Sequence, residues 1–189
     1  RKRLAQVRKS FESGVKQRSE GSNVEDAFFC GCVTYIKASM DRLHAQDQRI
    51  HDFLTPHVTD EKNQGILENL DMRLARSREA LKDLVGACDT FMASGGAGWN
   101  AFRMAVGKFM DVYLKILLSA QHSTLSLQEE VFDEKVWDKV ADATPESLKL
   151  EQELFATVQS SAPLGANPAS FIGGPPAPAK GSQNLKSEK

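Results

Sequence analysis

Residues 24–55 read VEDAFFCGCVTYIKASMDRLHAQDQRIHDFLT and have the spacing of one long amphipathic helix. Apolar side chains recur at alternating steps of three and four residues, which places them on one face of an α-helix. A single acid, Asp47, interrupts that face. The full row is Phe29, Cys32, Ile36, Met40, Leu43, Asp47, Ile50 and Leu54. We therefore expect this helix to turn an apolar face, with one carboxylate in it, toward neighbouring helices.

Capping residues, prolines and glycines divide the rest of the chain into similar segments. Ser22 and Glu25 have the spacing of a capping box, and Thr55-Pro56 ends the first helix because the residue before proline disfavours the α conformation. The next helix is expected at 59–94, and a third long helix follows the run Gly95–Gly98, from residue 99 to the acidic stretch 129–134. A short helical turn is expected at Trp137, and a last helix from Thr144-Pro145 to about residue 160.

These segments predict an all-α fold. No alternating run of strand length is present, and long helices joined by short loops are typical of antiparallel neighbours. We expect an up-down-up-down four-helix bundle over residues 22–160.

The two ends of the chain differ from the bundle in composition. Residues 1–20 form an amphipathic basic helix, and we expect it to pack on the bundle, although a membrane-surface or polyphosphate contact is the alternative. From residue 161 to residue 189 the chain is rich in Pro, Ala and Gly, which predicts a disordered tail. A docking peptide within Gly174–Pro178 is the alternative there.

Composition excludes several classes of protein. The chain has 189 residues and a net charge of −1, so we expect one globular domain and no nucleic-acid partner. No apolar run is long enough to span a membrane. Three cysteines are an odd number for a disulfide framework, which favours reduced thiols and the cytoplasm. The sequence begins at Arg1 rather than at Met, so we expect that an upstream segment has been removed.

The strongest site-like feature is the group His44, Asp47, His51 and Asp71. The first three share the inward face of residues 24–55, and Asp71 is expected near the level of His44 on the second helix. Helical bundles build metal sites from inward histidines and carboxylates, because the ion offsets the cost of burying them. A structural polar layer, in which Asp47 accepts hydrogen bonds from a histidine and from Arg73 or Arg78, is the alternative.

Other motifs carry weaker signals. Cys32 and Cys88 are expected as buried core thiols, and Cys30 and Cys32 point to different faces of their helix. The Gly95–Gly98 run follows no strand, so we interpret it as a helix connection and not as a phosphate loop. No nucleophile motif indicates hydrolysis. His122 is expected at the far edge of its helix, and His57 in an exposed loop.

Residues 24–160 resemble the hemerythrin-like (HHE cation-binding) family. The segment Leu43–Ile50 is similar to that family's first-helix histidine region, and the Trp137 turn precedes a last helix in the same way. The resemblance implies a four-helix bundle that binds iron, usually as a diiron pair, for oxygen, nitric oxide or iron sensing. Only His44 carries over, because the second and last helices of this chain lack histidine.

The sequence leads to two functional hypotheses. The first is a non-catalytic hemerythrin-like bundle with a reduced or lost metal site, holding iron or another divalent metal if it holds one. The second is a metal-free helical interaction or adaptor module, which contacts a protein partner through the basic helix or the proline-rich tail. An enzyme is the less expected outcome.

Overall fold

The computed structural model describes residues 2–117, 124–141 and 143–171, and every regular element in them is helical. The predicted all-α class is confirmed for this part of the chain. The α-helices are α1 (Lys2–Ser19), α2 (Asp26–Leu54), α3 (Glu61–Ala93), α4 (Trp99–Val112), α6 (Leu125–Val131), α7 (Glu134–Val140) and α8 (Pro145–Ser161). Shorter turns are η1 (Thr55–His57), the π-helical η2 (Tyr113–Leu117) and η3 (Pro168–Ser170).

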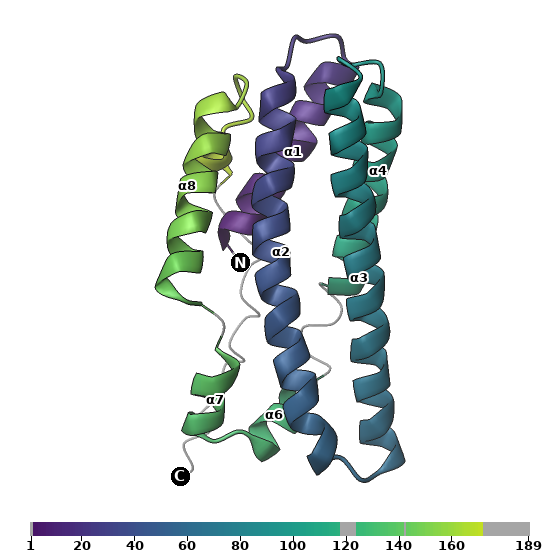
Figure 1. Ribbon diagram of the computed structural model, residues 1–189, viewed down its shortest axis with the longest axis vertical. Coiled ribbons are helices and arrows are strands. Elements are labelled where there is room, and N and C mark those ends of the chain that lie inside the picture. Colours follow the sequence, from purple (N-terminus) through teal and green to yellow (C-terminus); the bar gives the residue numbers. More distant parts are fainter. Residues whose placement is uncertain (1, 118–123, 142, 172–189) are drawn as a thin grey trace, which may run out of the picture.

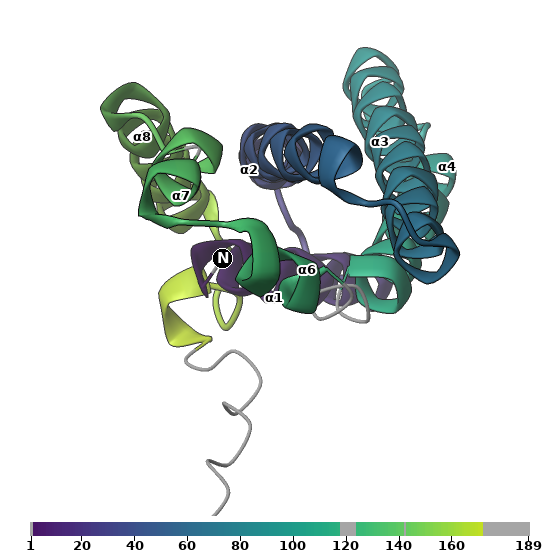
Figure 2. The same ribbon diagram turned by 90° about the horizontal axis from the view of Figure 1, so that it is seen from below.

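Helix α2 lies at the centre of the molecule. Figures 1 and 2 show α3 along one side of α2, α8 along the other, and α1 across a third side. Helix α4 packs mainly on α3. The extensive contacts of α8 are with α2, where Glu151 of α8 forms an ion pair with Arg42 in a largely buried setting. None of the helices in the described ranges is sufficiently long and apolar to cross a bilayer.

The starts of α2, α3 and α8 follow the predicted signals with two differences. Thr144 caps α8 by accepting a hydrogen bond from the amide of Ser147, with proline next to the cap, as predicted. Helix α3, which was expected from residue 59, begins at Glu61 and is capped by Asp60, which accepts a hydrogen bond from the amide of Asn63. The capping box at Ser22 is wrong, because Glu25 occupies the N-cap position of α2 and makes no side-chain cap bond.

The main core lies where α1, α2, α3 and α4 meet. Its centre is aromatic, and the stacked rings of Phe91 and Phe102 are 4.9 Å apart. Phe11 of α1 contacts Phe29 and Phe102, so the basic N-terminal helix contributes to the core. A smaller apolar cluster at the other end of α2 joins α6 and α7 to the α2–α3 pair. Apolar burial of this extent is the principal stabilising contribution in a bundle.

Two predicted segments end differently in the structure. The spacing predicts a third helix that continues to the acidic stretch 129–134, but α4 ends at Val112 and continues as the π-helical turn η2. Residues 118–123, including His122, lie outside the described residues. Residues 162–171 belong by composition to the expected disordered tail, yet they lie against α1, with Ala166 and Pro168 buried. The remainder, with Gly174–Pro178, is outside the described residues.

Candidate functional site

A layer of polar side chains lies between α2 and α3. These helices run antiparallel from the turn at residues 55–60, so residues at similar distances from that turn face each other. We call this group the polar layer. It consists of His44, Asp47 and His51 on α2 and of Asp71, Arg73 and Ser77 on α3.

His44 is the buried member of the polar layer. Its side chain is almost inaccessible, and Nε2 lies 2.8 Å from the hydroxyl oxygen of Ser77. Burial, with a smaller contribution from the positive charge of Arg78, lowers the pKa of His44 to about 4, and Asp41 acts in the opposite direction. At neutral pH, His44 is therefore an uncharged imidazole that holds α2 to α3.

His51 lies in a more polar setting, between two carboxylates. Its Nε2 is 3.2 Å from Asp71, and its Nδ1 is 3.3 Å from Asp52. The expectation that Asp71 lies at the level of His44 is thus wrong. The extra turn η1 between the helices shifts the register, so Asp71 faces His51, two helical turns from His44.

Asp47 is half-buried and lies near Arg73 of α3. Burial lowers the pKa of Arg73, and the charge of Asp47 opposes that effect by favouring the charged guanidinium. Arg78 donates a hydrogen bond to Gln48, at 3.1 Å. Asp47 therefore has the basic neighbour of a structural polar layer, and this neighbour is Arg73.

The four predicted metal ligands lie against different partners and do not converge on one point. His44 faces Ser77, Asp47 faces Arg73, and His51 faces Asp71. Within the described ranges, no three His, Cys, Asp or Glu side chains come together as a metal-binding group. In this arrangement, the residues do not fit a closed metal site or a diiron site.

His44 and Ser77 have the residue types of a nucleophile and a base. Ser77 is only 2% exposed, which keeps a substrate away from its hydroxyl. Both residues lie inside long helices, where the backbone amides are already bonded within the helix and cannot form an oxyanion hole. We interpret the pair as a structural hydrogen bond.

A pocket of about 220 Å³ opens next to the polar layer, between α2 and α3. Its lining combines apolar surface with charged ends of long side chains. Lys37 and Asp41 pair across one turn of α2, with Nζ 2.6 Å from the carboxylate. The lining residues of this α2–α3 pocket are Lys37, Asp41, His44, Arg78, Leu81, Lys82 and Val85. Sequence reasoning missed it, because Lys37, Arg78 and Lys82 appear singly on the outer faces of two helices.

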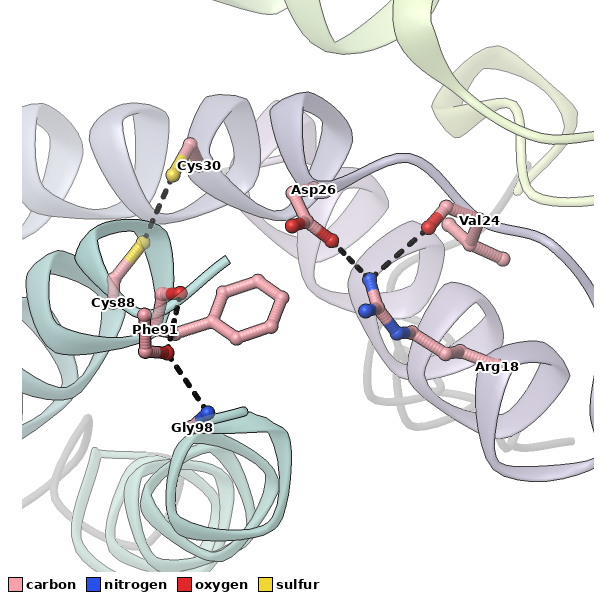
Figure 3. Close-up of polar contacts among 8 residues, drawn as sticks. Arg18, Val24, Asp26, Cys30, Cys88, Phe91 and Gly98 are labelled. Carbon is pink, nitrogen blue, oxygen red and sulfur yellow. Dashed lines mark hydrogen bonds and ion pairs between the residues drawn. The ribbon is translucent and has the colours of Figure 1, made fainter. Parts of the chain in front are cut away.

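The predicted burial of Cys32 and Cys88 is confirmed. The near neighbour of Cys88 is nevertheless Cys30, whose sulfur lies 3.1 Å from that of Cys88 (Figure 3).

His57 is exposed as predicted and stacks on Phe53.

Comparisons with known proteins give no relative for this chain. No protein-family model, no curated protein and no solved structure matches it.

Proposed function

We propose that this chain is a non-catalytic, metal-free helical binding module that takes a small organic anion in the α2–α3 pocket. The observation that carries the proposal is the charge of the pocket. Lys37, Arg78 and Lys82 supply three cations, against the single acid Asp41, which is paired with Lys37. Lys82 has no partner among the described residues, so its charge is available to a ligand.

The size and walls of the pocket narrow the class of ligand. Pockets for drug-sized molecules have volumes of about 300–1,000 Å³, so a pocket of about 220 Å³ suits a smaller molecule. Leu81 and Val85 offer apolar contacts, and His44 is neutral at physiological pH. A short-chain or aromatic monocarboxylate matches these features, with its apolar body inside and its carboxylate near Lys82 and Arg78.

Thermal denaturation with matched ligands tests the proposal. A ligand that binds only the folded chain raises the melting temperature, and the rise grows with ligand concentration. We expect a saturable rise of the melting temperature with benzoate, butyrate and valerate, and a much smaller rise with the corresponding neutral amides. An equal response to acids and amides, or none to either, would contradict an anion site.

Two variants locate the binding. Lys82→Met should weaken the response at least several-fold, because it removes the unpaired cation and keeps an apolar side chain of similar length. Lys62→Met is the matched control on the same helix, since Lys62 is exposed and lies outside the pocket. A similar loss in both variants would point to a nonspecific charge effect.

A divalent metal is the second candidate, and it would need ligands beyond His51, Asp71 and Asp52, which do not form a metal-binding group by themselves in the described part of the chain. Under this candidate, the chain is a hemerythrin-like bundle of four helices in up-down-up-down order. Its function is to sense iron or a similar ion. Elemental analysis of protein purified without a histidine tag, compared with His51→Ala and Asp71→Ala, tests it. Stoichiometric metal that both variants lose would favour this candidate. A well-folded, metal-free protein after reconstitution would exclude it.

A further inference from the structure

Two thiols from different helices lie next to each other in the main core. Cys30 belongs to α2 and Cys88 to α3, and their sulfurs are 3.1 Å apart across a sequence separation of 58 residues. Figure 3 shows the two side chains directed toward each other across the α2–α3 contact. A disulfide bond is about 2.05 Å long, so the sulfurs need to approach by about 1 Å to become bonded. Both cysteines are free thiols in this structure.

The two thiols differ in access to solvent. Cys30 is partly exposed, whereas Cys88 is 4% exposed. Burial raises the pKa of the Cys88 thiol, and its neighbour Cys30 raises it further. Cys88 is therefore the protonated, sheltered partner, and Cys30 is the sulfur that a reagent in solution meets first.

A third thiol makes the pairing specific. Cys32 follows Cys30 by two residues on α2, but it is fully buried. Residues two apart on a helix point to different faces, so the side chains of Cys30 and Cys32 diverge. Cys32 is thus sheltered from a reagent in solution, and burial also raises the pKa of its thiol well above the ordinary value.

We propose that Cys30 and Cys88 are a site of reversible oxidative modification, at which a low-molecular-weight disulfide such as oxidised glutathione converts the two thiols into a disulfide joining α2 to α3. The Cys30 thiolate attacks one sulfur of the reagent and releases the first glutathione thiolate, leaving a mixed disulfide on Cys30. Cys88 then loses its proton to solvent and attacks the Cys30 sulfur, releasing the second glutathione. Overall, two protein thiols are oxidised to one disulfide, and one glutathione disulfide is reduced to two glutathione molecules.

The disulfide would close a long loop that contains the turn between α2 and α3. Such a cross-link restricts the unfolded chain and raises the melting temperature, unless it strains the folded chain. Because the sulfurs are already close in the reduced protein, we expect the helices to stay in place and the melting temperature to rise. Dithiothreitol should reverse the change.

The test uses the full chain, incubated with oxidised glutathione, then denatured and alkylated with N-ethylmaleimide. Of the three cysteines, two should become inaccessible to the reagent, and peptide mapping should give one Cys30–Cys88 cross-link with an alkylated Cys32. The intact protein should lose about 2 Da before alkylation, for two hydrogens removed. Full alkylation of all three cysteines, a Cys30–Cys32 cross-link or a disulfide-linked dimer would overturn the proposal.

Variants separate the two chemical steps. Cys88→Ser should stop the reaction at the glutathione adduct on Cys30, and Cys30→Ser should leave Cys88 unmodified in the folded protein. Cys32→Ser is the matched control and should still form the Cys30–Cys88 bond. Should Cys88→Ser unfold, Cys88→Ala serves in the same assay, with circular dichroism reporting the fold. An adduct on Cys88 in the folded Cys30→Ser protein would overturn the assigned order of attack.

Discussion

At the scale of single residues, His44 makes the stability of the chain depend on pH. Its pKa falls from an ordinary value of 6.5 to about 4 on folding, because the imidazole is buried. Between these values the unfolded state binds a proton that the folded state does not, so the free energy of unfolding decreases as pH falls. We expect a loss of about 1–3 kcal/mol from this residue between pH 7 and pH 4.

Urea denaturation at several pH values measures this effect. His44→Gln should be less stable at pH 7 but should show a flatter pH dependence than the wild type. The control His57→Gln should keep the wild-type slope, because His57 is exposed. An unchanged slope in His44→Gln would mean that other groups cause the pH dependence.

Arg18 is a second residue whose contacts predict a measurable loss of stability on substitution. Its guanidinium lies 4.7 Å from the ring of Trp99 and 5.1 Å from that of Phe91, and it also pairs with Asp26 and with the carbonyl of Val24 (Figure 3). Lysine cannot reproduce a planar group that stacks and donates to two acceptors. Arg18→Lys should therefore reduce stability by about 1–3 kcal/mol. The matched control Arg76→Lys, at an exposed position of α3, should change it by less than about 0.5 kcal/mol, as measured by urea denaturation.

At the scale of helices, two glycines predict opposite outcomes for the same substitution. Gly14 of α1 faces the ring of Phe28, and a Cβ there would overlap that ring. Gly14→Ala should thus separate α1 from α2 and cost about 1–3 kcal/mol. At Gly86 of α3, a methyl group would meet no atom within 4 Å beyond the adjoining turns of its own helix, so Gly86→Ala should stabilise the chain by about 0.5–1 kcal/mol. Equal signs in the two variants, measured by thermal denaturation, would contradict the close α1–α2 approach.

The helix faces could be predicted from spacing, but the heights at which side chains meet could not. The inward direction of His44 follows from its position relative to Ile36 and Met40, and His44 is indeed buried. Spacing within one helix says nothing about its offset along the next, which here depends on the turn η1. For this reason the pairing of His51 with Asp71 was missed.

The proximity of Cys30 and Cys88 was missed for a related reason. The helical wheel assigned Cys32 to the core, and Cys32 is fully buried there. A residue at the edge of that face can still meet a neighbouring helix, because α1, α3 and α8 pack on different sides of α2. The partly exposed Cys30 contacts Cys88 in this way.

The π-helical turn η2 was also missed. The apolar spacing beyond Val112 predicted a continued α-helix, because it does not distinguish an α-helix from a single π-helical turn.

At the scale of the whole molecule, the C-terminal segment 162–171 holds the N-terminal helix in place. Ser10 of α1 donates a hydrogen bond to the carbonyl of Ala166, and Gln17 donates to that of Leu164, at 3.1 Å. Ala166 is fully buried in this contact. Helix α1 and residues 162–171, which are far apart in the sequence, therefore stabilise each other.

This contact predicts that a change in the C-terminal segment loosens α1. Ala166→Leu overfills a closed space and should cost about 1–3 kcal/mol, with faster amide hydrogen exchange in α1 than in the wild type. Ala169→Leu, at an exposed position three residues later, should change neither quantity. Faster exchange spread equally over α1 and α3 would indicate general destabilisation. A change confined to α1 and residues 162–171 would mean that the two ends open together, while α2 and α3, which carry both the pocket and the thiol pair, stay closed.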